Sequence, residues 1–196
     1  APRQWNRKLV NFLESIGFEQ SYADSCIFVR QGQKSTDLCI LAVYVDDIII
    51  LTKEKRMMAF IKKQLQEGFQ MKDLGELHFI LGVEVNRTSE GITLSQQHFV
   101  KKLLVKFGMA EAKTAPTPMD TSVQLQGEDG YSKPVDNVLY QSIVGSLLYI
   151  AMVTRPDIAY AVGVLGRFVK SPTEAHLTAA KRVLRYLKGK DLRLSL

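Results

Sequence analysis

Two adjacent acidic residues between two apolar runs constrain the fold of this chain more than any other feature. The runs cover residues 38–45 and 48–51, and Asp46 and Asp47 separate them. Both runs have the length of a β-strand. Because carboxylates are costly to remove from water, the pair must lie at an exposed turn or be neutralised by a cation. The sequence therefore predicts an antiparallel hairpin over residues 38–51, with both acids at or beside its turn.

The acidic pair has two interpretations. The first is a plain two-residue turn, since Asp is a common turn former, although the favoured two-residue turns contain a Gly that this pair lacks. The second is a metal site, because two carboxylates at the end of a rigid strand supply the hard oxygen ligands that two Mg²⁺ ions need. The spacing alone favours the turn over the metal site.

Hydrophobic periodicity predicts an α+β protein, with a mixed first part followed by an all-helical half. A long loop is expected at residues 113–136, which are rich in Pro and Gly. The expected helices cover residues 4–16, 54–67, 97–107, 137–151, 156–169 and 173–188. The expected strands cover residues 26–29, 38–45 and 48–51, with a further hairpin or strand at 77–85 that is interrupted at Gly82.

Composition narrows the function classes. No apolar run approaches the roughly 18 residues of a membrane span, so we expect no membrane partner. The formal net charge of +6 favours an acidic partner such as nucleic acid without proving one. The three histidines are too scattered for a metal cluster, and we expect each of them at the surface or hydrogen-bonded.

The two cysteines are predicted to be free thiols. If the strands at 26–29 and 38–45 pair around the loop between them, the register places Cys26 near Ala42 and Cys39 near Val29, so no disulfide joins the two cysteines. Free thiols fit a reducing environment. We therefore expect an intracellular protein, cytoplasmic or nuclear, that is not secreted.

A known family resembles this chain. The stretch Leu41-Ala42-Val43-Tyr44-Val45-Asp46-Asp47-Ile48 resembles the catalytic motif of reverse transcriptases, in which two acids lie at the turn of the palm hairpin. Further segments resemble the copia-type enzymes of this family in the same order along the chain. These segments cover residues 71–77, 79–85, 94–97, 117–119, 139–140, 145–149 and 154–162.

The resemblance implies an α+β fold made of a partial reverse-transcriptase palm, an antiparallel sheet with helices, followed by a helical thumb bundle. Residues 1–90 would be the partial palm, with the catalytic hairpin and the primer-grip segment. Residues 91–136 would be the entry helix of the thumb and a linker. Residues 137–196 would be the helical thumb or connection.

The resemblance also implies roles for the hairpin residues. Asp46 and Asp47 would be catalytic and would bind Mg²⁺, or Mn²⁺, in the full-length parent. Tyr44 and Val45 would complete the motif hairpin.

A second implied site is the primer grip, formed by Leu81, Gly82 and Val83. Gly82 would allow a close approach of the primer backbone, and the alternative is that it only marks a bulge.

A basic stripe lies on the last predicted helix, opposite its apolar face. The thumb resemblance supports contact of these residues with the nucleic-acid backbone through counterion release, and the alternative is a solvated helix face. The stripe consists of Lys181, Arg182, Arg185 and Lys188.

The resemblance further implies that the chain is a fragment of an RNA-directed DNA polymerase. In this family another metal-binding Asp and the nucleotide-gripping fingers lie upstream, and a ribonuclease H domain lies downstream. The parent would act on an RNA or DNA template-primer and deoxynucleotides, and the fragment alone is expected to be inactive. One alternative is a degenerate retroelement remnant that acts only as a basic nucleic-acid-binding module. A metal-dependent phosphodiesterase is a weaker alternative, because no further acidic cluster or catalytic His accompanies the pair.

Overall fold

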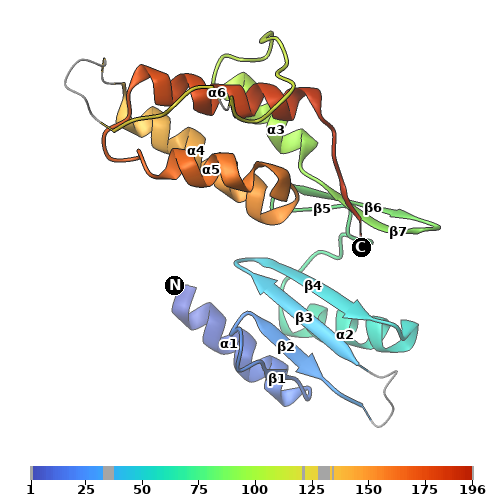
Figure 1. Cartoon of the computed structure of the whole chain (residues 1–196). Coiled ribbons are helices and arrows are strands. Elements are labelled where there is room, and N and C mark those ends of the chain that lie inside the picture. The colour runs from blue at the N-terminus through green and yellow to red at the C-terminus, as the bar shows by residue number, and fades with distance from the viewer. Residues whose placement is uncertain (1, 33–37, 121, 128–132, 134, 196) are drawn as a thin grey trace. The chain divides into compact units, whose positions relative to one another are not determined.

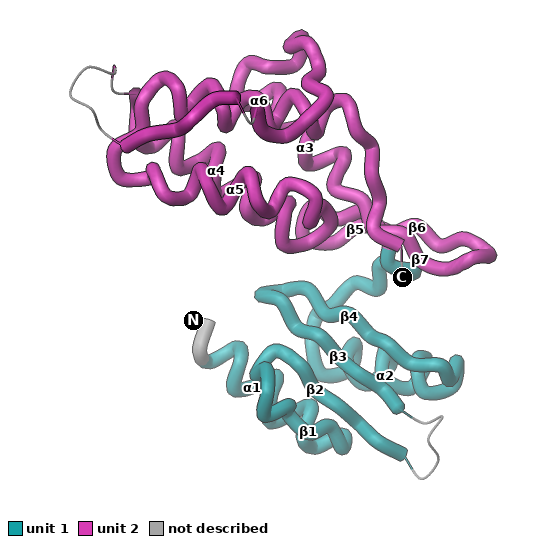
Figure 2. The backbone as a smooth tube through the Cα atoms, viewed as in Figure 1, with its two compact units in different colours: residues 1–77 teal, residues 78–196 magenta. Residues whose placement is uncertain are grey.

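The chain divides into two compact units (Figure 2), unit 1 at Ala1–Leu77 and unit 2 at His78–Leu196. This boundary lies before the one at residue 90 expected from the sequence, so the segment from 78 to 90 groups with the helices that follow it. The computed structural model describes residues 2–32, 38–120, 122–127, 133 and 135–195. Part of the loop predicted at 113–136 lies outside these residues, and its described part has no helix or strand.

Unit 1 is an antiparallel sheet covered by two helices (Figure 1). Its elements are α1 (Pro2–Ser15), β1 (Glu19–Gln20), β2 (Ile27–Arg30), β3 (Cys39–Tyr44), β4 (Asp47–Thr52) and α2 (Lys55–Gly68). The strands pair in the order β1-β2-β3-β4, each antiparallel to the next. The chain thus makes a simple meander, with β4 at an edge of the described sheet.

Alternating burial along β3 explains how unit 1 forms its core. Cys39, Leu41 and Val43 are buried, whereas the residues between them are less buried. Because side chains alternate between the faces of a strand, one face of β3 points into the core. The helices contribute the residues that cover this face, namely Leu9 and Leu13 of α1 and Ile61 and Leu65 of α2.

The pairing of β2 with β3 differs by one residue from the expected register. Ile27 lies opposite Ala42, where the sequence expectation placed Cys26. The observed register sets Phe28 opposite Leu41, and both side chains are buried. A shift of one residue would move one of these two side chains to the other face of the sheet. The two cysteines are free, as predicted.

Unit 2 combines a second antiparallel sheet with a helical bundle. Its elements are β5 (Phe79–Ile80), β6 (Val83–Thr88), β7 (Gly91–Ser95), α3 (Gln97–Lys106), α4 (Asn137–Val153), the 3₁₀ helix η2 (Pro156–Ile158), α5 (Ala159–Gly166), α6 (Glu174–Gly189) and β8 (Leu194–Ser195). The strand order is β5-β6-β7-β8. The predicted α+β class, with antiparallel sheets and helices, is therefore confirmed.

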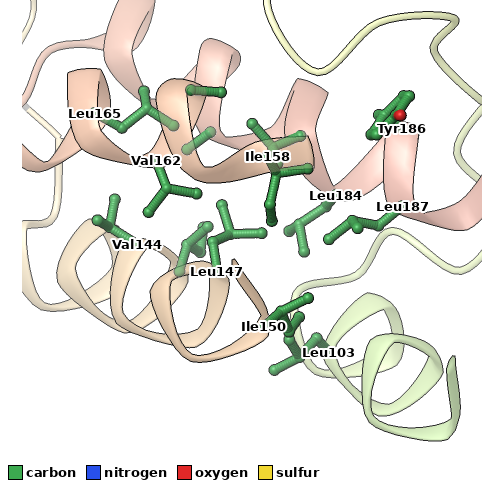
Figure 3. Packing of buried hydrophobic residues seen from close by; sticks show 14 of the residues in the cluster. Leu103, Val144, Leu147, Ile150, Ile158, Val162, Leu165, Leu184, Tyr186 and Leu187 are labelled. Atoms are coloured by element: carbon green, nitrogen blue, oxygen red, sulfur yellow. The ribbon is translucent and has the colours of Figure 1, made fainter. Parts of the chain in front are cut away.

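The bundle core is formed by side chains from four helices. Figure 3 shows Leu147 of α4, Val162 of α5 and Leu184 of α6 turned toward one another, with Leu103 of α3 beside Ile150. All five side chains are buried, and burying one such side chain contributes about 1.5–3 kcal/mol. The helices of unit 2 therefore share one core, and α3 belongs to it.

No helix in the described part of the chain is long and apolar enough to span a membrane.

Candidate active site

The two acids lie at a two-residue hairpin turn between β3 and β4. Tyr44 pairs with Asp47, which leaves Val45 and Asp46 as the turn residues and makes Asp47 the first residue of β4. Both carboxylates are exposed, so their charges keep their hydration. The predicted hairpin, with the acids at or beside its turn, is confirmed, and the turn begins one residue before the acidic pair.

Val45 has an unusual backbone conformation. Its φ of +52° lies in a region that β-branched residues rarely adopt. A positive φ at the first turn residue is the mark of a type II′ turn, in which Gly is preferred at this position. Such strain costs on the order of 1–3 kcal/mol and persists only where the surroundings impose it. Here the paired strands β3 and β4 impose it directly beside the two acids.

The acidic pair offers part of a metal site. Adjacent α-carbons lie about 3.8 Å apart, and both carboxylates are exposed at the turn. In the described residues, no three His, Cys, Asp or Glu side chains gather into a group that could hold a metal ion. Carboxylate oxygens suit Mg²⁺, which usually keeps several waters and takes only one or two protein carboxylates. Asp46 and Asp47 thus fit such an ion in ligand type and leave positions for other ligands.

The predicted primer-grip residues form a second two-residue turn, in unit 2. Ile80 pairs with Val83, which leaves Leu81 and Gly82 in the turn between β5 and β6. Their φ values are +51° and +81°, and two positive values are typical of a type I′ turn. Gly82 therefore serves the turn itself and does not mark a bulge. Leu81 remains 46% exposed at the tip, where an apolar side chain is available to a partner.

Two aromatic residues from the helices support this turn. The Tyr149 hydroxyl on α4 donates a hydrogen bond to the Leu81 carbonyl. The Phe99 ring on α3 packs edge-to-face on Tyr149 at 5.6 Å, and a side chain at position 82 would meet the same Phe99 ring. Sequence reasoning missed this support, although Tyr149 lies in one of the family-like segments.

The predicted basic stripe lies on α6, and much of its hydrogen-bonding capacity is used within unit 2. Three of the four residues hold the segment at 110–120. Arg182 donates a hydrogen bond to the Thr117 hydroxyl and forms an ion pair with Asp120 at 3.7 Å. Arg185 donates to the Lys113 carbonyl at 2.6 Å. Lys188 donates to the carbonyls of Ala110 and Ala112. Lys181 has no such partner in the described part of the chain. Contact of this stripe with phosphate stays a prediction.

The predicted site residues thus fall into three groups. The hairpin with Asp46 and Asp47 belongs to unit 1, and the turn at Leu81 and the stripe on α6 belong to unit 2.

Comparison with known proteins identifies the family of proteins that this chain resembles. Residues 1–121 match the family model described as reverse transcriptase (RNA-dependent DNA polymerase). The chain belongs to the reverse transcriptase family. Its predicted membership of the copia type is also confirmed, because the similar curated proteins are transposon polyproteins of that type.

Several relatives align with almost the whole reverse transcriptase chain. The retrovirus-related Pol polyprotein from transposon RE1 of Arabidopsis thaliana is 44% identical over 96% of the chain, and that from transposon TNT 1-94 of Nicotiana tabacum is 38% identical over 96%. The putative transposon Ty5-1 protein of Saccharomyces cerevisiae is 37% identical over 95%. The chain spans only 13% of the RE1 polyprotein and 15% of the TNT 1-94 polyprotein. No solved structure matches it significantly.

Proposed function

We propose that this chain supplies the acidic hairpin of an RNA-directed DNA polymerase active site, with Asp46 and Asp47 as the metal-binding carboxylates. The observation that carries the proposal is the exposed acidic pair at a turn strained at Val45, in a chain of the reverse transcriptase family. In the parent protein, a primer 3′-hydroxyl would attack the α-phosphate of a deoxynucleotide on an RNA or DNA template. The chain would thus be partial palm and thumb.

The metal proposed for the site is Mg²⁺, or Mn²⁺. When bound, it supplies positive charge that activates the attacking hydroxyl and steadies the leaving oxygen. Asp46 and Asp47 would hold it, and the turn at Leu81, Gly82 and Val83 would position the primer end.

We further propose that the chain alone is inactive. Two adjacent acids leave the metal site short of a carboxylate, which in this family comes from an upstream strand, and the fingers that hold the nucleotide are also upstream. In the described sheet, β4 begins with Asp47 and has an unpaired edge, so a further strand can pair beside the acids. Working geometry needs every ligand held in place. A downstream ribonuclease H segment would be a further neighbour in the parent.

Primer extension on an RNA template with Mg²⁺ tests both parts of the proposal. In the parent polyprotein, Asp46→Asn should lower extension by about 100-fold or more, since it removes a carboxylate from the metal site. Glu14→Gln, which changes an exposed acid on α1, should leave extension unchanged. The isolated chain should give no extension product.

Three results would contradict the proposal in different ways. Full extension by the Asp46→Asn polyprotein would remove the metal-binding role. Extension by the isolated chain that Asp46→Asn abolishes would show that the chain is a sufficient polymerase. If the parent polyprotein binds nucleic acid but does not extend the primer, the alternative of a degenerate retroelement remnant would be favoured. Such a remnant would act only as a basic nucleic-acid-binding module, and the net charge of +6 is sufficient for that binding.

We also propose an intracellular location, in the cytoplasm or the nucleus. Both cysteines are free, which fits a reducing compartment.

A further inference from the structure

A hollow of about 250 Å³ lies in unit 1 between β2 and the first turns of α2. Its lining consists of Arg30, Arg56, Met57 and Phe60. Arg30 lies opposite Cys39, and Cys39 lies opposite Thr52 at the end of β4. Because the acidic turn is at the other end of the same strands, the hollow is separated from it by roughly 17 Å of strand. The hollow is therefore not part of the candidate active site.

Among the residues that the structure describes, the positive charge in this hollow has no acidic partner. The Nη1 atom of Arg30 is buried and has no hydrogen-bond partner. Its guanidinium lies over the Phe60 ring, with 5.1 Å between the guanidinium carbon and the ring centre. Within the described residues, neither Arg30 nor Arg56 makes an ion pair. Arg30 is half-buried, and a guanidinium without an ion pair attracts an incoming anion.

The start of α2, beside Arg56, has free backbone N–H groups. Glu54 is the N-cap residue, and its side chain makes no capping hydrogen bond. The first turn contains no acidic residue and carries Lys55 and Arg56 instead. The free N–H groups and the dipole of a helix N-terminus favour negative charge at this end. Arg30 and Arg56 line the hollow, and Arg56 belongs to the first turn of α2, whose dipole also favours an anion.

The apolar part of the lining indicates which anion. Phe60 is 43% exposed, and Met57 is half-buried beside it. A free phosphate would leave this apolar surface without a partner, whereas a peptide can place a carboxylate on the arginines and a neighbouring apolar side chain on Phe60. Arginine also binds carboxylates through two parallel hydrogen bonds.

We propose that this hollow binds an acidic peptide segment, with an Asp or Glu side chain on Arg30 and Arg56 and an adjacent apolar side chain on Phe60. The site goes beyond the proposed polymerase function and does not depend on it. It would dock another polypeptide segment on the reverse transcriptase chain.

The test is an NMR titration of the 196-residue chain with a blocked peptide of alternating Leu and Asp. The peptide should shift the side-chain Nε–H signals of Arg30 and Arg56. Arg30→Gln and Arg56→Gln should each weaken binding about tenfold or more, since each removes one partner of a charged pair. Arg7→Gln, an exposed arginine on α1, should change the affinity less than twofold.

Matched probes separate the peptide from other anions. The same peptide with Asn in place of Asp should not bind. Equal binding by the Asn peptide, or unchanged affinity in both hollow variants, would overturn the proposal. Tighter binding of inorganic phosphate or oligothymidylate at the same two arginines would also overturn it and would assign a phosphate site. Because Arg56 is exposed on α2, Arg56→Gln keeps the test decisive if Arg30→Gln does not fold.

Discussion

Val45 combines a β-branched side chain with a positive φ, and this strain can be measured. Val45→Gly should raise the free energy of unfolding of unit 1 by about 1 kcal/mol, because the strain relieved is about 1–3 kcal/mol and the added chain entropy of Gly offsets part of it. Urea unfolding followed by the fluorescence of Trp5, the single Trp, reports on unit 1. Ala59→Gly in α2 should instead lower stability by about 1 kcal/mol. Destabilisation by both variants would show that Val45 is unstrained.

His176 is hydrogen-bonded away from the surface, which is one of the two environments expected for the histidines. It is buried, and its ring stacks on Phe168 with 4.0 Å between ring centres. Its Nδ1 accepts a hydrogen bond from the Thr173 backbone N–H at 2.9 Å. Burial lowers the pKa of His176 from its usual 6.5. Only the neutral ring can accept the bond that caps α6.

This pKa shift predicts acid sensitivity of unit 2. Below pH 6.5 the unfolded chain gains a proton at His176 that the folded chain resists, so unfolding becomes easier as pH falls from 7.5 to 5. The loss of stability is measured by urea unfolding between pH 7.5 and 5, followed by circular dichroism. His176→Gln keeps an acceptor for Thr173 and should flatten this part of the profile. An unchanged profile in this variant would assign the acid sensitivity to other groups.

At the residue scale, the sequence located the acids because apolar runs flank them. It could not locate the strain at Val45, because the exact turn depends on the pairing of Tyr44 with Asp47. The burial of His176 depends in the same way on a tertiary contact, its stacking on Phe168.

At the scale of elements, hydrogen bonds of the Arg155–Asp157 ion pair join η2 to the end of α6. Arg155 is 3% exposed and pairs with Asp157 at 2.8 Å. Arg155 also donates to the Lys190 carbonyl, and the Tyr186 hydroxyl donates to Asp157. Burial alone would raise the pKa of Asp157, but the hydrogen bonds from Arg155 and Tyr186 outweigh it and lower the pKa. Arg155 and Asp157, in the family-like segment at 154–162, therefore have a structural role.

Asp157→Asn should lower the free energy of unfolding of unit 2 by about 1–3 kcal/mol, because it leaves the buried Arg155 charge uncompensated. The expected loss is moderate because the Asp157 side chain is 30% exposed, so water already screens the pair. Thermal unfolding followed by circular dichroism at pH 7 measures the change. The matched variant Asp191→Asn removes an exposed pair with Arg193 and should cost less than about 0.5 kcal/mol. Equal losses in the two variants would contradict the structural role of the buried pair.

Elements that depend on local sequence patterns were predicted, whereas elements that depend on contacts between distant parts of the chain were not. The amphipathic helices α1, α2 and α6 were predicted because their periodicity is local. Strands β1, β7 and β8 were missed. β1 and β8 have two residues each, and β7 and β8 lie in the half of the chain that was wrongly expected to be all helical, where β8 exists only through its pairing with the distant β7. The predicted helix at 156–169 is a 3₁₀ turn followed by α5, which ends at Gly166.

At the scale of the whole molecule, the unit boundary follows strand pairing rather than composition. The sequence boundary at residue 90 marked the change from mixed to helical character. The structure groups β5 and β6 with the later helices because β6 pairs with β7 and β7 pairs with β8 near the end of the chain. A pairing between segments so far apart has no local signal in the sequence. The division into palm and thumb stays a prediction.

The charge of the whole chain predicts weak, salt-dependent nucleic-acid binding, since a net charge of +6 attracts phosphates without reading bases. Within the α6 stripe, Lys181 has no partner in the described structure, whereas Arg185 holds the Lys113 carbonyl. Lys181→Gln should therefore reduce the slope of log affinity against log salt concentration by about 1, and Arg185→Gln should lower the melting temperature with little change in slope. Anisotropy of a labelled RNA–DNA duplex between about 50 and 200 mM KCl measures the slopes. An equal loss of slope in both variants would show that Arg185 also binds phosphate, and that nucleic acid replaces its hydrogen bond to the Lys113 carbonyl.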